Sequence, residues 1–149
     1  MKASTKVIFL VLIISTVILP QNVLHVPSQY PTIQSAVNSS QTGDSILVQP
    51  GTYYENINWI GHNSVTLISA GDTRSTIIDG GANGRVLYIE GENITVIGFS
   101  FENGLSGAGG GIWAVGDITF DKICIRNNTS NGNGGGIYIE DSVTNFVLL

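Results

Sequence analysis

The sequence predicts an all-β protein that folds as a right-handed parallel β-helix, a solenoid with coils of about 25 residues. Three observations lead to this fold class. Apolar and aromatic residues recur at a fixed spacing, short runs of alternating apolar residues are separated by turns rich in Gly and Asn, and charged residues make up only 11% of the chain. Successive coils of such a solenoid stack in register, so equivalent side chains form ladders along the axis.

Two strands recur in each coil of the second half of the chain. The first is marked by Leu87, Ile112 and Ile137, which recur at equal steps of one coil length. The second is marked by Ile94, Ile118 and Val143, which recur at almost the same step. Apolar residues alternate within these strands, as expected where every second side chain faces a core. We therefore expect two apolar ladders inside the stack.

The N-terminal segment, residues 1–21, has the features of a signal peptide. Lys2 and Lys6 precede an uncharged apolar run over positions 7–19. This run is short for a membrane span and has the length found in export signals. Residues 1–21 are therefore predicted to direct a secreted or cell-surface protein, with a retained membrane anchor as the alternative. We expect contact with a membrane only through this segment.

Residues 22–44 are predicted to form an N-terminal cap that consists of a short strand and a helix over 32–40. Ile33, Ala36 and Val37 have helical spacing in this stretch, and an amphipathic helix can cover the open apolar end of a solenoid. Residues 45–149 are predicted to form the coils. The chain stops within a strand, so we expect a C-terminally truncated β-helix.

Composition excludes several function classes. The net charge is -5 with only six Lys and Arg residues, which argues against binding to nucleic acid, because phosphate recognition needs clustered cations. Cys124 is the only cysteine, so no internal disulfide is predicted. His25 and His62 stand alone in the sequence, and no metal site or cofactor is expected.

The N-terminal region resembles the opening of pectin-lyase-like β-helix proteins. The matching segments are Y-P-T-I-Q-S-A-V at 30–37, G-D-S-I-L-V-Q-P-G-T-Y at 43–53, and Glu55 shortly after them. The resemblance implies a β-helix, but it does not fix a function, because the superfamily includes lyases, hydrolases, esterases and surface proteins. The G-G-G-I segments at 109–112 and 134–137 are similar to the G-G-A-I repeats of polymorphic outer-membrane proteins, which implies adhesion.

No catalytic residue is assigned. The active-site segments of pectin methylesterases, G-Y-Q-D-T-L and D-F-I-F-G, are absent. The nearest charged set is Asp79, Glu102, Asp121 and Arg126. Glu102 and Arg126 are equivalent in adjacent coils, and we expect them to form an exposed ion pair with a structural role.

The candidate binding residues are Tyr88, Trp113 and Tyr138. Each follows a core position, so alternation places all three on the outside in one ladder. Exposed aromatic rings can stack on the apolar faces of sugars, which predicts carbohydrate binding. The alternative is that the rings stack on each other, or are covered by a later segment or a partner chain.

The sequence thus predicts a secreted or cell-surface β-helix that binds a polysaccharide, a cell-surface glycan or a host surface. The alternative is the N-terminal part of a polysaccharide lyase or glycoside hydrolase that acts on pectin-like acidic polysaccharides, with its catalytic coils beyond residue 149.

Overall fold

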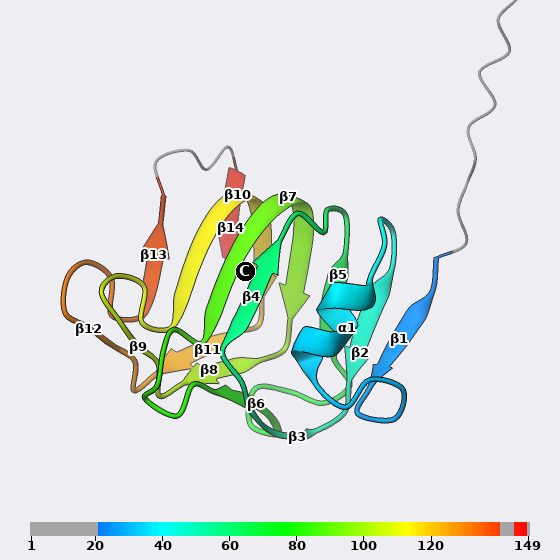
Figure 1. Cartoon of the computed structure of the whole chain (residues 1–149), viewed down its shortest axis with the longest axis horizontal. Coiled ribbons are helices and arrows are strands. Elements are labelled where there is room, and N and C mark those ends of the chain that lie inside the picture. The colour runs from blue at the N-terminus through cyan, green and yellow to red at the C-terminus, as the bar shows by residue number, and fades with distance from the viewer. Residues whose placement is uncertain (1–20, 141–144, 149) are drawn as a thin grey trace, which may run out of the picture.

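Short strands wind around one axis, and each coil pairs in parallel with the next (Figure 1). The predicted all-β fold is confirmed as a parallel β-solenoid, in a computed structural model that describes residues 21–140 and 145–148. The predicted signal peptide lies outside the described residues, apart from residue 21. The elements, in chain order, are β1 (Val23–Val26), α1 (Ile33–Ser39), β2 (Ser45–Val48), β3 (Gly51–Tyr54), β4 (Ile57–Ile60), β5 (Thr66–Ser69), β6 (Thr76–Asp79), β7 (Leu87–Ile97), β8 (Ser100–Glu102), β9 (Leu105–Ser106), β10 (Ile112–Asp121), β11 (Cys124–Arg126), β12 (Thr129–Ser130), β13 (Ile137–Ile139) and β14 (Asn145–Leu148).

Three sheets form the walls of the solenoid. The largest has the order β1-β2-β5-β7-β10-β13, with β4 also paired to β7 and β14 to β10. The second has the order β11-β8-β6-β3, and the third is the pair β12-β9. Strands β7 and β10 are long enough to turn a corner within the largest sheet: the first half of β7 pairs with β4, and its second half pairs with β5.

The register confirms most of the predicted repeat and corrects its last copy. Leu87 is paired with Ile112 and Ile112 with Ile137, as their equal spacing predicted. The alignment of Val143 with Ile118 is wrong, because Phe146 is the partner of Ile118. β10 runs through the corner without a break, whereas the partners of Ile112 and Ile118 in the last coil, Ile137 and Phe146, lie on two separate strands. Ile137 and Phe146 are further apart in the sequence than Ile112 and Ile118, which explains the shifted partner.

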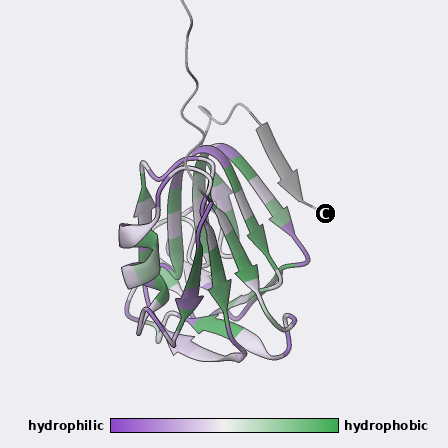
Figure 2. Ribbon diagram, turned by 90° about the vertical axis from the view of Figure 1, so that its right-hand side faces the viewer, coloured by the Kyte–Doolittle hydropathy of each residue, from purple (hydrophilic) through white to green (hydrophobic). Residues whose placement is uncertain are grey.

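The core lies inside the walls and is built from the alternating apolar positions. Figure 2 shows the strands banded in hydrophobic and hydrophilic residues. The largest fully buried side chains are those of Trp59, Phe99, Phe101 and Phe120. Burial of a side chain of this size contributes about 1.5 to 3 kcal/mol to folding, so the stacked apolar ladders supply the main stabilisation of the coils.

The short helix expected near the N-terminus is present as α1. It begins after Thr32, whose hydroxyl oxygen accepts a hydrogen bond from the Ser35 N–H at 3.0 Å. The Ser35 hydroxyl accepts one from the Thr32 N–H in return, which completes a capping box. The helix buries Ile33, Ala36 and Val37 and packs on β1, β2 and β4. The helix thus covers apolar side chains at the N-terminal end of the stack.

Candidate functional site

The structure brings the three predicted aromatic residues together. Tyr88 is the register partner of Trp113, and Trp113 is the partner of Tyr138. The ring centroids of Tyr88 and Trp113 are 5.9 Å apart with planes at 63°, and those of Trp113 and Tyr138 are 5.0 Å apart at 76°. The rings therefore contact each other edge to face, the geometry that their quadrupoles favour. We call Tyr88, Trp113 and Tyr138 the aromatic ladder.

The aromatic ladder lies on the outside because of strand alternation. Leu87 and Ile112, which precede Tyr88 and Trp113, are completely buried. The aromatic side chains themselves are half-buried. Parallel strands are about 4.8 Å apart, and this spacing sets the distance from one ring to the next. The ladder is thus a row of outward rings, one on each of three successive coils.

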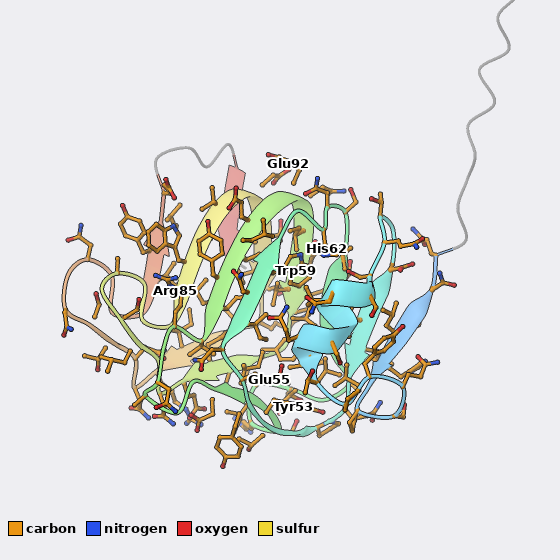
Figure 3. All side chains as sticks on the ribbon, in the orientation of Figure 1. Tyr53, Glu55, Trp59, His62, Arg85 and Glu92 are labelled. Atoms are coloured by element: carbon orange, nitrogen blue, oxygen red, sulfur yellow. The ribbon has the colours of Figure 1, made fainter. Side chains whose placement is uncertain are left out.

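Arg85 contacts two rings of the aromatic ladder, those of Trp113 and Tyr88. Its guanidinium carbon lies 4.5 Å from the centroid of the Trp113 ring and 5.7 Å from that of Tyr88, within cation–π range. The same guanidinium donates hydrogen bonds to Gly109 O at 2.9 Å, Ala108 O at 2.8 Å and Ser106 Oγ at 3.1 Å. Burial lowers the pKa of Arg85, and the Tyr88 phenol opposes this shift. Figure 3 shows Arg85 beside the first half of β10.

Two carboxylates complete the site. The Tyr88 hydroxyl donates to Glu90 Oε2 at 2.7 Å, and Trp113 Nε1 donates to Glu140 Oε2 at 3.1 Å. The hydrogen bond to Glu90, together with burial, raises the pKa of Tyr88 to about 12. Each carboxylate therefore orients one ring, and Tyr88 keeps its proton at neutral pH.

A shallow depression adjoins the aromatic ladder. Its volume is about 330 Å³, and it is lined by Ile60, Gly61, Asn63, Glu90, Gly91, Glu92, Val115 and Gly116. Glu90 belongs to both features, because its carboxylate binds the Tyr88 hydroxyl and also lines the depression. Ile60, the partner of Glu90 on β4, is 52% exposed. The ladder and the depression thus form one continuous outer surface.

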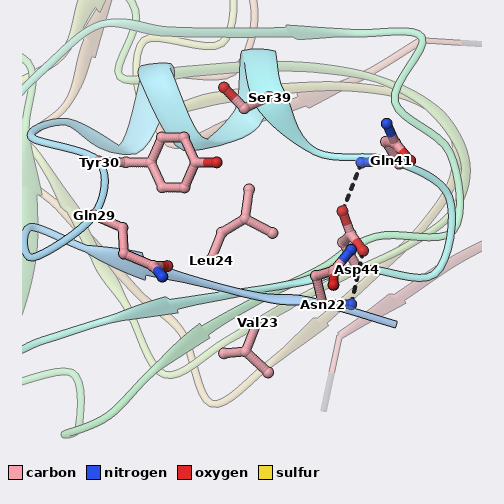
Figure 4. Close-up of a pocket in the computed structure, with 8 residues that line it drawn as sticks. All are labelled: Asn22, Val23, Leu24, Gln29, Tyr30, Ser39, Gln41 and Asp44. Carbon is pink, nitrogen blue, oxygen red and sulfur yellow. Dashed lines mark hydrogen bonds between the residues drawn. The ribbon is translucent and has the colours of Figure 1, made fainter. Parts of the chain in front are cut away.

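A second depression of about 500 Å³ lies at the N-terminal end, between α1 and β1 (Figure 4). Asp44 is the charged residue in its lining. Both carboxylate oxygens of Asp44 accept backbone hydrogen bonds, from the N–H groups of Asn22 and Gln41 at 2.9 Å each. Since these bonds fix the chain around α1, the role of Asp44 is structural.

The charged residues considered for catalysis are engaged in structural contacts. Arg126 binds Glu102 through Nε and Nη2, at 2.7 and 2.6 Å from Oε1. Asp79 accepts hydrogen bonds from Gly81 N–H and the Asn103 side-chain amide. Asp121 lies 3.5 Å from Lys122. The carboxylate oxygens of these residues thus accept hydrogen bonds, or form ion pairs, within turns and between coils.

The Glu102–Arg126 pair was predicted correctly, but its exposure was not. The Arg126 side chain is 53% exposed, whereas that of Glu102 is only 10% exposed. Glu102 is flanked on both sides, by its register partners Asp79 and Arg126. A residue in the middle of a ladder is covered by its neighbours, which explains the burial.

Sequence reasoning missed Arg85, Glu90 and Glu140. Both glutamates follow a ladder tyrosine at the second position, in the segments Tyr88-Ile-Glu90 and Tyr138-Ile-Glu140. Strand alternation alone would have placed them on the same outer face. Arg85 precedes β7 in a turn, and no periodic pattern predicts that its side chain reaches the neighbouring coil.

The described residues hold no group of three or more His, Cys, Asp or Glu side chains suited to a metal ion. Within the same part of the chain, no helix is apolar and long enough to cross a membrane. No protein-family model matches the chain, and a search of curated proteins gave no match either. The chain is therefore defined by its architecture, a β-solenoid with an aromatic ladder on its outer face. The resemblances to pectin-lyase-like proteins and to polymorphic outer-membrane proteins stay predictions.

Proposed function

We propose that this chain is an exported β-solenoid that binds polysaccharide through the aromatic ladder. The observation that carries the proposal is the row of three half-exposed rings, in which Tyr88 and Trp113 are held in place by Arg and Glu side chains. A ring whose rotamer is already fixed loses little conformational entropy when a ligand packs on it. Sugars present apolar C–H faces to such rings, and their hydroxyl groups need hydrogen-bond partners nearby.

The surface beside the ladder meets the second need. Glu90, Glu140 and Asn58 lie on the same outer face, where Asn58 is the register partner of Tyr88 on β4. Carboxylate and amide oxygens accept hydrogen bonds from hydroxyl groups. A chain of sugar units that runs across the coils would contact rings and acceptors together, because both recur along the axis.

The mutual contact of the rings agrees with this proposal and also with a purely structural role. Edge-to-face contacts between neighbouring rings stabilise the stack by about 0.5 to 1.5 kcal/mol. Removal of one ring therefore affects both polysaccharide binding and stability. The stability of each variant has to be measured together with its binding.

The test is affinity gel electrophoresis of the protein in gels that contain soluble neutral, acidic or amino polysaccharides. The unmodified protein is expected to be retarded by at least one class. Trp113→Ala should weaken that affinity by about tenfold, which corresponds to about 1.4 kcal/mol. Tyr54→Ala is the matched control, because Tyr54 is 78% exposed but lies on β3 in another sheet. Retardation by no polysaccharide, or equal affinity for the protein and a folded Trp113→Ala variant, would overturn the proposal.

A further inference from the structure

The charges around the aromatic ladder are the next observation. Glu90 and Glu140 bind the ladder through one oxygen, Oε2 in each case. The other oxygen, Oε1, accepts no hydrogen bond from the residues that the structure describes. Glu92 lines the adjoining depression and is exposed. Carboxylate oxygens with free acceptor capacity thus border the rings and the depression next to them.

The cationic side chain at this surface already has hydrogen-bond partners within the protein. Arg85 is the cationic residue that contacts the ladder, and its guanidinium donates hydrogen bonds to two carbonyl groups and a serine hydroxyl. Among the described residues, no other Lys or Arg contacts a ladder ring or lines the adjoining depression. An anionic sugar at the ladder would therefore meet carboxylates without a free guanidinium or ammonium group to bind it, and like charges repel at this range.

We propose that the ligand of the aromatic ladder is a polysaccharide with protonated amino groups. This inference rests on the proposed function and names its substrate class. An ammonium group can donate to the free oxygen of Glu90 or Glu140 in a charge-assisted hydrogen bond. It can also lie over the exposed part of a Tyr or Trp ring, which attracts cations. Rings and carboxylates in adjacent rows therefore suit a polymer that combines apolar sugar faces with positive charge.

A positively charged polymer would be attracted both by the carboxylates at the ladder and by the net charge of the whole chain. The whole chain has a net charge of -5, so any polycation is attracted weakly at low salt. The specific contact differs from this general attraction, because it requires both the rings and the two glutamates. The experiment has to separate these two sources of affinity.

The probes are chitosan as the amino polymer, hydroxyethyl cellulose as the neutral one and polygalacturonate as the acidic one, at physiological salt and mildly acidic pH. The unmodified protein should bind chitosan at least tenfold more tightly than either of the others. The double variant Glu90→Gln/Glu140→Gln should lose about three- to tenfold in affinity for chitosan, as expected for two exposed charge pairs. Its affinity for the neutral polymer should fall by a smaller factor than its affinity for chitosan, because Gln keeps an acceptor oxygen for hydroxyl groups but carries no charge. Trp113→Ala should weaken binding of chitosan too.

Asp121→Asn is the matched control, because it removes the same type of charge at the far end of β10. It should leave the affinity for chitosan unchanged. Equal losses in Asp121→Asn and in the double variant would overturn the inference, since general charge attraction would then explain the binding. Equal or tighter binding of the neutral or the acidic polymer, with loss in Trp113→Ala, would overturn the inference and leave the proposed function in place. Binding of no polymer would overturn both.

Discussion

The side chain of Gln34 and the backbone of Asn58 form two hydrogen bonds with each other. Gln34 Nε2 donates to Asn58 O at 3.0 Å, and Asn58 N–H donates to Gln34 Oε1 at 2.7 Å. β4 pairs with β7 on one side, so the amide of Gln34 takes the place of a neighbouring strand on the other. A helix side chain thus satisfies part of a sheet edge.

Gln34→Ala should therefore destabilise the protein. Both backbone groups of Asn58 lose their partner, and each lost hydrogen bond costs about 0.5 to 1.5 kcal/mol. We expect the free energy of unfolding in urea to fall by about 1 to 3 kcal/mol. Gln41→Ala is the control, because Gln41 is also exposed near α1 but donates only through its backbone N–H. A loss of equal size in both variants would contradict the role of Gln34.

Glu55 should be needed for α1. Its Oε1 and Oε2 accept hydrogen bonds from the N–H groups of Ile33 and Gln34, at 2.9 Å each. These are N–H groups of the first turn, which have no partner within the helix. Glu55→Ala should lower the free energy of unfolding by about 1 to 3 kcal/mol, and Glu55→Gln, which keeps one acceptor oxygen, should lower it less. Equal stability of Glu55→Ala and the unmodified protein in urea would contradict this assignment.

Tyr88 should titrate at about pH 12 in the folded protein, because its hydroxyl donates to Glu90 and is partly buried. The ordinary value is 10.0, so the unfolded chain loses this proton at lower pH than the folded one. The contribution of Tyr88 to stability is therefore complete below about pH 10 and is lost as the pH rises towards 12. The phenolate absorbance, taken as the difference between the unmodified protein and Tyr88→Phe, measures this pKa. A difference curve centred on the ordinary value would contradict the hydrogen bond.

Arg85 should position Trp113. Lys in its place keeps the charge, but a single ammonium group cannot reach three acceptors and lie flat over a ring. Arg85→Lys should destabilise the protein by about 1 to 3 kcal/mol and shift the fluorescence of Trp113 to longer wavelength. The other tryptophan, Trp59, is completely buried. Its fluorescence is measured alone in a Trp113→Phe variant, and subtracting it gives the spectrum of Trp113. An unaltered Trp113 spectrum in Arg85→Lys would refute the positioning role.

Gly116 should be the least replaceable residue at the corner of β10. Its φ is +102°, and a Cβ atom there would collide with the carbonyl oxygen of Gly91 on the previous coil. Gly116→Ala should therefore cost about 1 to 3 kcal/mol. Gly107→Ala is the control, since nothing lies within 4 Å of a Cβ at that position, and its effect should stay below about 1 kcal/mol. Chemical denaturation of the two variants decides the comparison.

The fold could be predicted because the residues that repeat are the apolar ones, which must be buried. Leu87 and Ile112 recur at the coil length, and in-register parallel pairing follows once each coil has the same length. The same logic placed Tyr88 next to Trp113. The error at Val143 arose where the coil length changed, because a repeat read from the preceding coils carries no information about a longer connection.

The environment of the aromatic ladder was harder to predict. The burial of Glu102 depends on what lies on the coils before and after it, and the path of Arg85 depends on the rotamer of a long side chain in a turn. Glu90 and Glu140 could have been found by alternation. Their contacts with Tyr88 and Trp113 needed coordinates, since the spacing along a strand gives only the face.

The corner of the two long strands has a consequence for how such a chain can evolve. Ile94 is the third residue beyond Gly91, but its partner Ile118 is only the second beyond Gly116, and the register on both sides of this irregularity is intact. A single-residue insertion or deletion at the corner is thus absorbed locally, whereas one inside a strand would move the side chains of that strand beyond it to the opposite face. Coil length can drift at the corners while the outer face keeps its pattern. The outer face and the corners of the scaffold are therefore free to diversify separately.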